Sequence, residues 1–102
     1  MAEYRTVCRI EELRTGEGRL FEWDGKQIAV FRRDDGEYRA IDDTCLHAGG
    51  PLHEGGILEG RVVCPWHHWE FDLEDGSCSL NPFHKLTVYR VREREGEVQV
   101  EV

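Results

Sequence analysis

Hydrophobic and polar residues alternate along this chain over short stretches that predict β-strands. Residues 28–32 and 86–91 show the mixed alternation that is typical of strands in a small barrel or sandwich. Similar short runs recur along the rest of the chain. We therefore expect strands over residues 4–9, 19–23, 28–32, 37–41, 61–64, 69–73, 86–92 and 97–101.

Turn signals separate these runs. An acidic residue followed by glycine readily supplies the positive φ angles that a tight hairpin needs. Helix is expected only as a single turn over residues 11–14, before Gly16. The pattern thus predicts an all-β, antiparallel fold. The four acidic residue–glycine pairs that mark its turns are Asp24-Gly25, Asp35-Gly36, Asp75-Gly76 and Glu95-Gly96.

Residues 43–83 differ from their surroundings. This stretch holds three of the four cysteines, four of the five histidines and all three prolines. We interpret it as a loop-rich subdomain inserted into a base of flanking strands. The base comprises residues 2–42 and 84–102, and the whole chain, 1–102, is one domain.

Charge and hydropathy narrow the classes of partner. The formal net charge of −8 argues against nucleic acid and anionic membranes, and it permits steering toward a basic protein. The N-terminus lacks the apolar stretch of a signal peptide, and no segment approaches the roughly 20 apolar residues of a membrane span. We expect a cytoplasmic protein with reduced cysteines, and closely spaced cysteines in that compartment more often bind metal than form disulfides.

Two short motifs carry the candidate chemistry. Cys45-Leu46-His47 and Cys64-Pro65-Trp66-His67 are separated by sixteen residues, and each offers one thiolate and one imidazole. A set of two Cys and two His suits zinc or an iron–sulfur cluster. Classical zinc fingers pair like ligands, whereas here each motif mixes them, which favours a cluster in which two irons share the ligands. A structural zinc module stays as an alternative.

This spacing resembles the Rieske ferredoxins, which include the ferredoxins of aromatic-ring dioxygenase systems and the small subunit of assimilatory nitrite reductase. Residues 45–52 resemble the first cluster loop of that family, and residues 64–72 resemble the second. The resemblance implies a small antiparallel β-sandwich with one Rieske-type 2Fe–2S cluster at its tip. It implies that Cys45 and Cys64 bind the inner iron and that His47 and His67 bind the outer, solvent-facing iron.

Departures from the high-potential members of that family bear on the reduction potential. Those proteins clamp their loops with two cysteines, at positions that correspond here to Gly50 and Trp66. They also place hydroxyl groups near the sulfurs, at positions that correspond to Trp69 and Phe71, neither of which has one. Because hydrogen bonds to sulfur favour the reduced cluster, we expect a potential in the lower half of the Rieske range of about −150 to +300 mV.

The resemblance implies an electron carrier without a substrate of its own. We expect it to pass single electrons from a flavoprotein reductase to a terminal oxygenase. The alternative is the small Rieske subunit of an NAD(P)H-dependent nitrite reductase, in contact with the large subunit. A complete Rieske oxygenase is excluded as an expectation, because 102 residues leave no room for its mononuclear iron domain.

The remaining histidines need no special role. His53, His68 and His84 are expected to be ordinary surface or hydrogen-bonded residues. His68 takes the place of the glycine that the family usually has after the second ligand histidine, so the second loop is expected to be slightly altered.

The other cysteines and the acidic pairs are expected to be structural. Cys8 and Cys78 are predicted to be partly buried, reduced thiols. The acidic pairs at residues 34–35 and 42–43 are predicted to be solvated turns. Three aromatic residues are expected to pack against the cluster loops and exclude water, namely Trp66, Trp69 and Phe71.

Overall fold

The protein is described by a computed structural model that covers residues 3–44, 50–66, 69–78 and 85–102. Nearly all its regular structure is antiparallel β, as predicted. The strands are β1 (Tyr4–Arg9), β2 (Gly18–Trp23), β3 (Lys26–Arg32), β4 (Tyr38–Asp42), β5 (Ile57–Leu58), β6 (Arg61–Val63), β7 (Glu70–Asp72), β8 (Val88–Tyr89), β9 (Val91–Arg94) and β10 (Glu97–Glu101), with short 3₁₀ turns η1 (Ile10–Glu12) and η2 (Leu52–Glu54).

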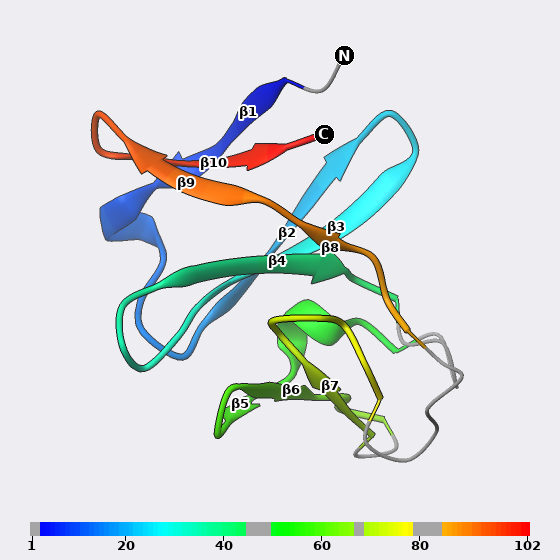
Figure 1. The fold of residues 1–102 in the computed structure, drawn as a ribbon. Coiled ribbons are helices and arrows are strands. Elements are labelled where there is room, and N and C mark those ends of the chain that lie inside the picture. Colours follow the sequence, from blue (N-terminus) through cyan, green and yellow to red (C-terminus); the bar gives the residue numbers. More distant parts are fainter. Residues whose placement is uncertain (1–2, 45–49, 67–68, 79–84) are drawn as a thin grey trace.

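The strands form three small sheets that lie one above another in Figure 1. The upper sheet has the order β1-β10-β9, the middle sheet β2-β3-β4-β8 and the lower sheet β5-β6-β7. All their pairings are antiparallel. We call the upper and middle sheets, with residues 85–87, the base, and the described residues 43–44, 50–66 and 69–78 the inserted region.

Strand β3 is buried on both faces, which explains its unbroken apolar run. Ile28 and Val30 pack into the core between the upper and middle sheets. Ala29 and Phe31 point the other way, into the core shared with the inserted region. Since successive side chains of a strand point to opposite faces, one run of four apolar residues supplies both cores.

The two cores differ in the elements that supply them. The base core is mostly aliphatic and includes Val98 and Val100 of β10 together with the buried Cys8. The second core joins the middle sheet to the inserted region, and its members come from many short elements. They are Ala29, Phe31, Ile41, Leu52, Val62, Cys64, Phe71, Leu73, Cys78 and Leu86.

The predicted run over residues 86–92 is two strands, because the chain changes sheets at Arg90. Strand β8 pairs with β4 in the middle sheet, whereas β9 pairs with β10 in the upper sheet. The Arg90 carbonyl accepts a hydrogen bond from the Glu101 N–H at 2.8 Å. A continuous alternation of side chains therefore hides a break in strand pairing.

Two short elements of the inserted region were not predicted, namely strand β5 and the 3₁₀ turn η2. Strand β5 is joined to the predicted strand β6 by a hairpin with positive φ at Glu59 (50°) and Gly60 (79°). This is the same acidic residue–glycine signal that identified the other turns, but β5 has only two residues. The predicted helical turn at 11–14 is instead the 3₁₀ turn η1, at whose start the Glu12 carboxylate accepts the Arg9 N–H at 2.8 Å.

Within the described residues, no helix has the length and apolar character needed to cross a membrane.

Candidate cluster-binding site

The first predicted cluster loop is closed at its base by backbone contacts. The Leu52 N–H donates to the Asp43 carbonyl at 2.7 Å, and Thr44 forms an isolated antiparallel bridge with Pro51. Residues 45–49 run between these flanks and include the predicted ligands Cys45 and His47, which lie outside the described residues. The structure thus defines the two flanks of the loop as a tight pair of chain segments.

The second predicted cluster loop is closed in a similar way. The Cys64 N–H donates to the Trp69 carbonyl at 2.7 Å, which joins the two flanks of the loop just after β6 and just before β7. The Cys64 side chain is completely buried. The predicted ligand His67 and its neighbour His68 lie outside the described residues.

The two loops meet at Gly50. A Cβ atom at this position would lie 2.9 Å from Cys64 Sγ and 3.2 Å from Cγ and Cδ2 of Trp66. Only glycine lets the first loop approach the Cys64 thiol this closely. The positions 50 and 66, matched above to the paired cysteines of high-potential relatives, are indeed neighbours.

The described residues fit a thiolate-bound cluster. Cys64 is a free, buried cysteine at the contact between two loops, each of which carries one Cys and one His in the sequence. A buried thiol in such a place has the chemistry that an iron–sulfur cluster needs. No group of three His, Cys, Asp or Glu residues suited to a metal occurs within the described part of the chain, and three of the four predicted ligands lie outside that part.

The other described cysteines behave as predicted. Cys8 and Cys78 are buried and free, and they belong to different cores, so they are not bonded to one another. Burial is the main cause that raises the pKa of the Cys8 thiol above its ordinary value. This keeps Cys8 a thiol, as expected for a packing residue.

The aromatic residues around the site divide into two kinds. Phe71 is fully buried, and Trp69 packs against the same core. These two exclude water from the inserted region, as predicted. Trp66 differs, because 57% of it is exposed even though its ring lies beside Gly50. It places apolar surface at the outside of the second loop.

The acidic pair at residues 42–43 is not a solvated turn, and that prediction is wrong. Asp43 is only 4% exposed, and its carboxylate accepts the backbone N–H of His53 at 2.7 Å and the ring Nδ1–H at 2.8 Å. Asp42 faces the other side, where its carboxylate accepts the Thr87 N–H and the Tyr89 hydroxyl. Composition suggested two exposed carboxylates, but backbone and ring donors from distant segments stabilise them inside the fold. The pair at residues 34–35 is exposed, as predicted.

His53 is the site residue that sequence reasoning undervalued. It was predicted to be an ordinary hydrogen-bonded histidine, and its partner proves to be the buried Asp43. The only sequence signal was its place just after the first loop. Tyr89 is a similar donor to Asp42, since its hydroxyl bonds to that carboxylate. Burial, together with this hydrogen bond, raises the pKa of Tyr89 far above its ordinary value.

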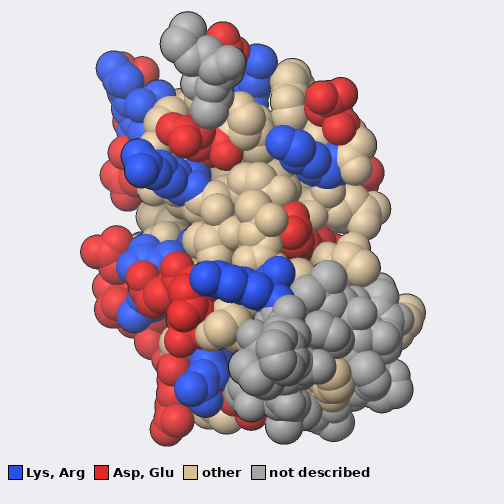
Figure 2. Space-filling view, turned by 45° about the vertical axis from the view of Figure 1, so that its right-hand side comes forward, with Lys and Arg blue, Asp and Glu red and all other residues tan. Residues whose placement is uncertain are grey.

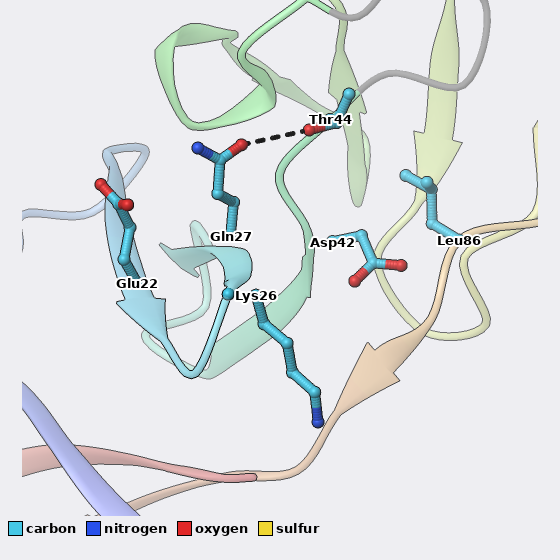
Figure 3. Close-up of a pocket in the computed structure, with 7 residues that line it drawn as sticks. Glu22, Lys26, Gln27, Asp42, Thr44 and Leu86 are labelled. Atoms are coloured by element: carbon cyan, nitrogen blue, oxygen red, sulfur yellow. Dashed lines mark hydrogen bonds between the residues drawn. The ribbon is translucent and has the colours of Figure 1, made fainter.

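A shallow hollow of about 390 Å³ lies beside the flanks of the first loop (Figure 3). Within it, the Thr44 hydroxyl donates to Gln27 Oε1 at 3.4 Å. Acidic and basic groups face the same space, so the hollow has no single charge. Its lining residues are Glu22, Gly25, Lys26, Gln27, Asp42, Thr44 and Leu86.

Charges of both signs also cover the surface in Figure 2. On the face shown, Lys and Arg side chains are interspersed with Asp and Glu, and acidic groups gather along its left side. The described residues on this face form no extended basic stripe, which agrees with the net charge of −8.

Comparison with curated proteins finds relatives that are much longer than this chain. Chlorophyllide a oxygenase from Oryza sativa subsp. japonica is 39% identical over 80 residues, which are 74% of this chain and 15% of that protein. Apoptosis-inducing factor 3 from Mus musculus is 37% identical over 95 residues, which are 87% of this chain and also 15% of that protein. The chain thus spans about 15% of the length of these relatives.

Solved structures of similar size match almost end to end. A protein described as an NADH-dependent nitrite reductase small subunit from Mycobacterium tuberculosis matches with a TM-score of 0.93 and 30% identity, over 100% of this chain and 96% of that one. The ferredoxin of carbazole 1,9a-dioxygenase from Nocardioides aromaticivorans matches with a TM-score of 0.85 and 28% identity, over 95% of both chains.

A family model settles the classification. The model for the Rieske [2Fe-2S] domain matches residues 3–92, which include both predicted cluster loops. Its match agrees with the closed loops and the buried thiol described above. The chain therefore belongs to the Rieske [2Fe-2S] domain family, which implies one Rieske-type 2Fe–2S cluster.

Proposed function

We propose that Cys45, His47, Cys64 and His67 hold the cluster, and that the chain passes single electrons from a flavoprotein reductase to a terminal oxygenase. The observation that carries the proposal is the contact between the loops, where Gly50 leaves room for the buried Cys64 thiol. When bound, the cluster supplies a one-electron redox couple.

The chain's own residues position and shield this site. The backbone bonds that close each loop hold Cys64 and the flanks of the first loop in place. Phe71 and Trp69 exclude water on the inner side. Because neither has a hydroxyl to donate to sulfur, they support a potential in the lower half of the Rieske range.

Trp66 supports docking of a protein partner at this end of the molecule. More than half of its surface is exposed, and it directly follows Pro65, which is exposed too. Tryptophan is enriched among the residues that dominate binding energies at protein interfaces. A structure similar to this chain at 30% identity was solved in complex with the oxygenase of carbazole 1,9a-dioxygenase, which supports an oxygenase as acceptor.

A second candidate is the small subunit of a nitrite reductase. It is favoured by the TM-score of 0.93 to the Mycobacterium tuberculosis protein, whose match covers all of this chain. In that case the lasting partner would be a large flavoprotein subunit that contains sirohaem.

Spectroscopy on anaerobically purified protein tests the ligand set. We expect a red-brown protein with two irons per chain and, after dithionite, a rhombic EPR signal of low average g. A colourless protein with zinc and no iron would contradict the proposal.

Partner assays then separate the two candidates. A dioxygenase-type flavoprotein reductase with NADH should reduce the protein, and a terminal oxygenase should reoxidise it. We expect Trp66→Ala to lower kcat/KM for the oxygenase about tenfold or more, as for a hot-spot residue. Trp23→Ala, on the base and 39% exposed, is the matched control and should have no effect. Stable co-purification with a sirohaem flavoprotein, without turnover by the oxygenase, would favour the nitrite reductase subunit.

A further inference from the structure

A buried carboxylate lies beside the first cluster loop. Asp43 is 4% exposed and stands two residues before the predicted ligand Cys45, so covalent geometry limits their Cα separation to about 7 Å. No Lys or Arg is bonded to it among the contacts of the described residues. Its side-chain hydrogen-bond partner is His53, whose side chain is 22% exposed.

One oxygen of this carboxylate receives two hydrogen bonds. Asp43 Oδ1 accepts the His53 backbone N–H at 2.7 Å and the ring Nδ1–H at 2.8 Å. A buried carboxylate is costly unless donors compensate it, and bonds to a charged acceptor are stronger than neutral ones. The two His53 donors therefore compensate the burial of this carboxylate.

The backbone of Asp43 joins three segments. Its N–H donates to the Gln27 carbonyl at 2.9 Å, and its carbonyl accepts the Leu52 N–H at 2.7 Å. The same residue thus ties the start of the first loop to β3 and to η2. These backbone bonds fix the position from which the Asp43 side chain reaches His53.

We propose that Asp43 and His53 form a positioning pair that fixes the base of the first cluster loop and tunes the cluster's reduction potential. The inference rests on the proposed place of Cys45 and His47 among the ligands. Reduction adds one negative charge to the cluster, and a fixed carboxylate nearby opposes it, more strongly in a buried site than in water. The donors on His53 partly offset that effect.

The two members of the pair thus act on the potential with opposite signs. Asp43→Asn removes the charge but keeps an oxygen that can accept from His53, so the potential should rise. His53→Leu removes the ring donor and leaves an apolar group of similar size that keeps water out, so the carboxylate is less compensated and the potential should fall. If the pair only stabilised the fold, the two variants would not shift the reduction potential in opposite directions.

The test is the midpoint potential of the full-length, cluster-loaded protein, measured by voltammetry together with iron content. For Asp43→Asn we expect the reduced-to-oxidised ratio at fixed potential to rise about tenfold, which is about 59 mV for a one-electron couple. For His53→Leu we expect a fall of about threefold, since it changes a dipole and not a full charge. His53→Gln, which can still donate an N–H, should restore most of the wild-type potential.

Asp34→Asn is the matched control, because it removes the same charge from an exposed turn at the opposite end of β4. It should leave the potential unchanged. Equal shifts in Asp34→Asn and Asp43→Asn, or shifts of the same sign in Asp43→Asn and His53→Leu, would overturn the inference. If Asp43→Asn loses its cluster, the fall in His53→Leu and its recovery in His53→Gln decide the question. A wild-type protein without a 2Fe–2S spectrum would instead refute the proposed ligand set, so the two failures are distinct.

Discussion

The base and the inserted region are built in different ways. Strands in the base have up to seven residues, and long ladders such as β2–β3 and β1–β10 hold them together. The strands β5–β7 of the inserted region have only two or three residues. Its structure depends instead on close backbone contacts and on the core that it shares with β3 and β4.

This difference shows that short, irregular segments can be held in place by a regular sheet support. Regular strand pairing satisfies backbone groups without help from particular side chains. In the inserted region the same groups are satisfied by single contacts, such as Leu52 N–H to Asp43 carbonyl and Cys64 N–H to Trp69 carbonyl. A substitution in the inserted region should therefore affect cluster binding, whereas a substitution in the base should mainly affect the free energy of unfolding.

The sharpest way to test this contrast is to compare two buried cysteines. Cys64→Ala removes a proposed ligand from the inserted region, and we expect complete loss of the visible spectrum and of bound iron. Cys8→Ala removes a thiol from the base core and should cost about 1 kcal/mol of unfolding free energy, as for loss of a methylene-sized group.

Absorption spectra, iron analysis and chemical denaturation measure both effects. The contrast is broken if Cys8→Ala also loses iron, or if Cys64→Ala retains a wild-type spectrum.

Two residues of β3 provide the next test, because they face different cores. Phe31→Ala opens a cavity in the core shared with the inserted region and should cost about 3–5 kcal/mol. Ile28→Ala opens one in the base core and should cost about 2–5 kcal/mol. We expect only the first to accelerate loss of the cluster, measured as the decay of visible absorbance under conditions where both variants stay folded. Equal decay rates would mean that both cores affect retention of the cluster to the same extent.

The same contrast explains what the sequence could predict. Strands β1 and β10 have the predicted bounds, and most of the other base strands agree within one or two residues, because long alternating runs match long ladders. Strand β5 and turn η2 are too short to produce a period, so they were missed. The break at Arg90 was missed because pairing with a new sheet leaves the alternation intact.

At the site, local motifs were informative and distant contacts were not. The Cys-x-His and Cys-x-x-His spacing predicted the family that the Rieske model confirms. The full ligand set stays a prediction, as does the division of the chain at residue 84, because these positions include residues outside the described ones. The burial of Asp43 depends on His53, ten residues later, and no rule of composition or spacing predicts such a pair.

Adjacent glycines in the inserted region test the role of close contacts. A Cβ at Gly55 would lie 2.0 Å from the Val63 carbonyl oxygen, just before Cys64, whereas a Cβ at Gly56 would meet nothing within 4 Å. Gly55→Ala should therefore cost about 1–3 kcal/mol by overpacking and shift the cluster's visible circular dichroism. Gly56→Ala should be neutral or add about 0.4–1 kcal/mol, since it restricts the unfolded chain. If both variants behaved alike, backbone approach would not be what shapes this region.

The smallest expected effect is at the charged link between the two regions. Glu74 follows β7, and its Oε1 bonds to Arg33 in the β3–β4 turn and, at 2.8 Å, to Nε of Arg39 in β4. The Glu74 side chain is 58% exposed, so the network resembles a surface ion pair more than a buried one. Glu74→Gln should therefore lower the unfolding free energy by about 0.2–1 kcal/mol.

Salt dependence separates this link from ordinary packing. At about 1 M salt the Debye length is about 3 Å, so the difference between Glu74→Gln and wild type should largely disappear. Glu59→Gln, at an exposed turn of the same region, is the control for removing one charge from an acidic protein. Because the protein has a net charge of −8, that control should be neutral or slightly stabilising at low salt. A loss in Glu74→Gln that persists at high salt would mean that shape, and not charge, holds the inserted region against the base.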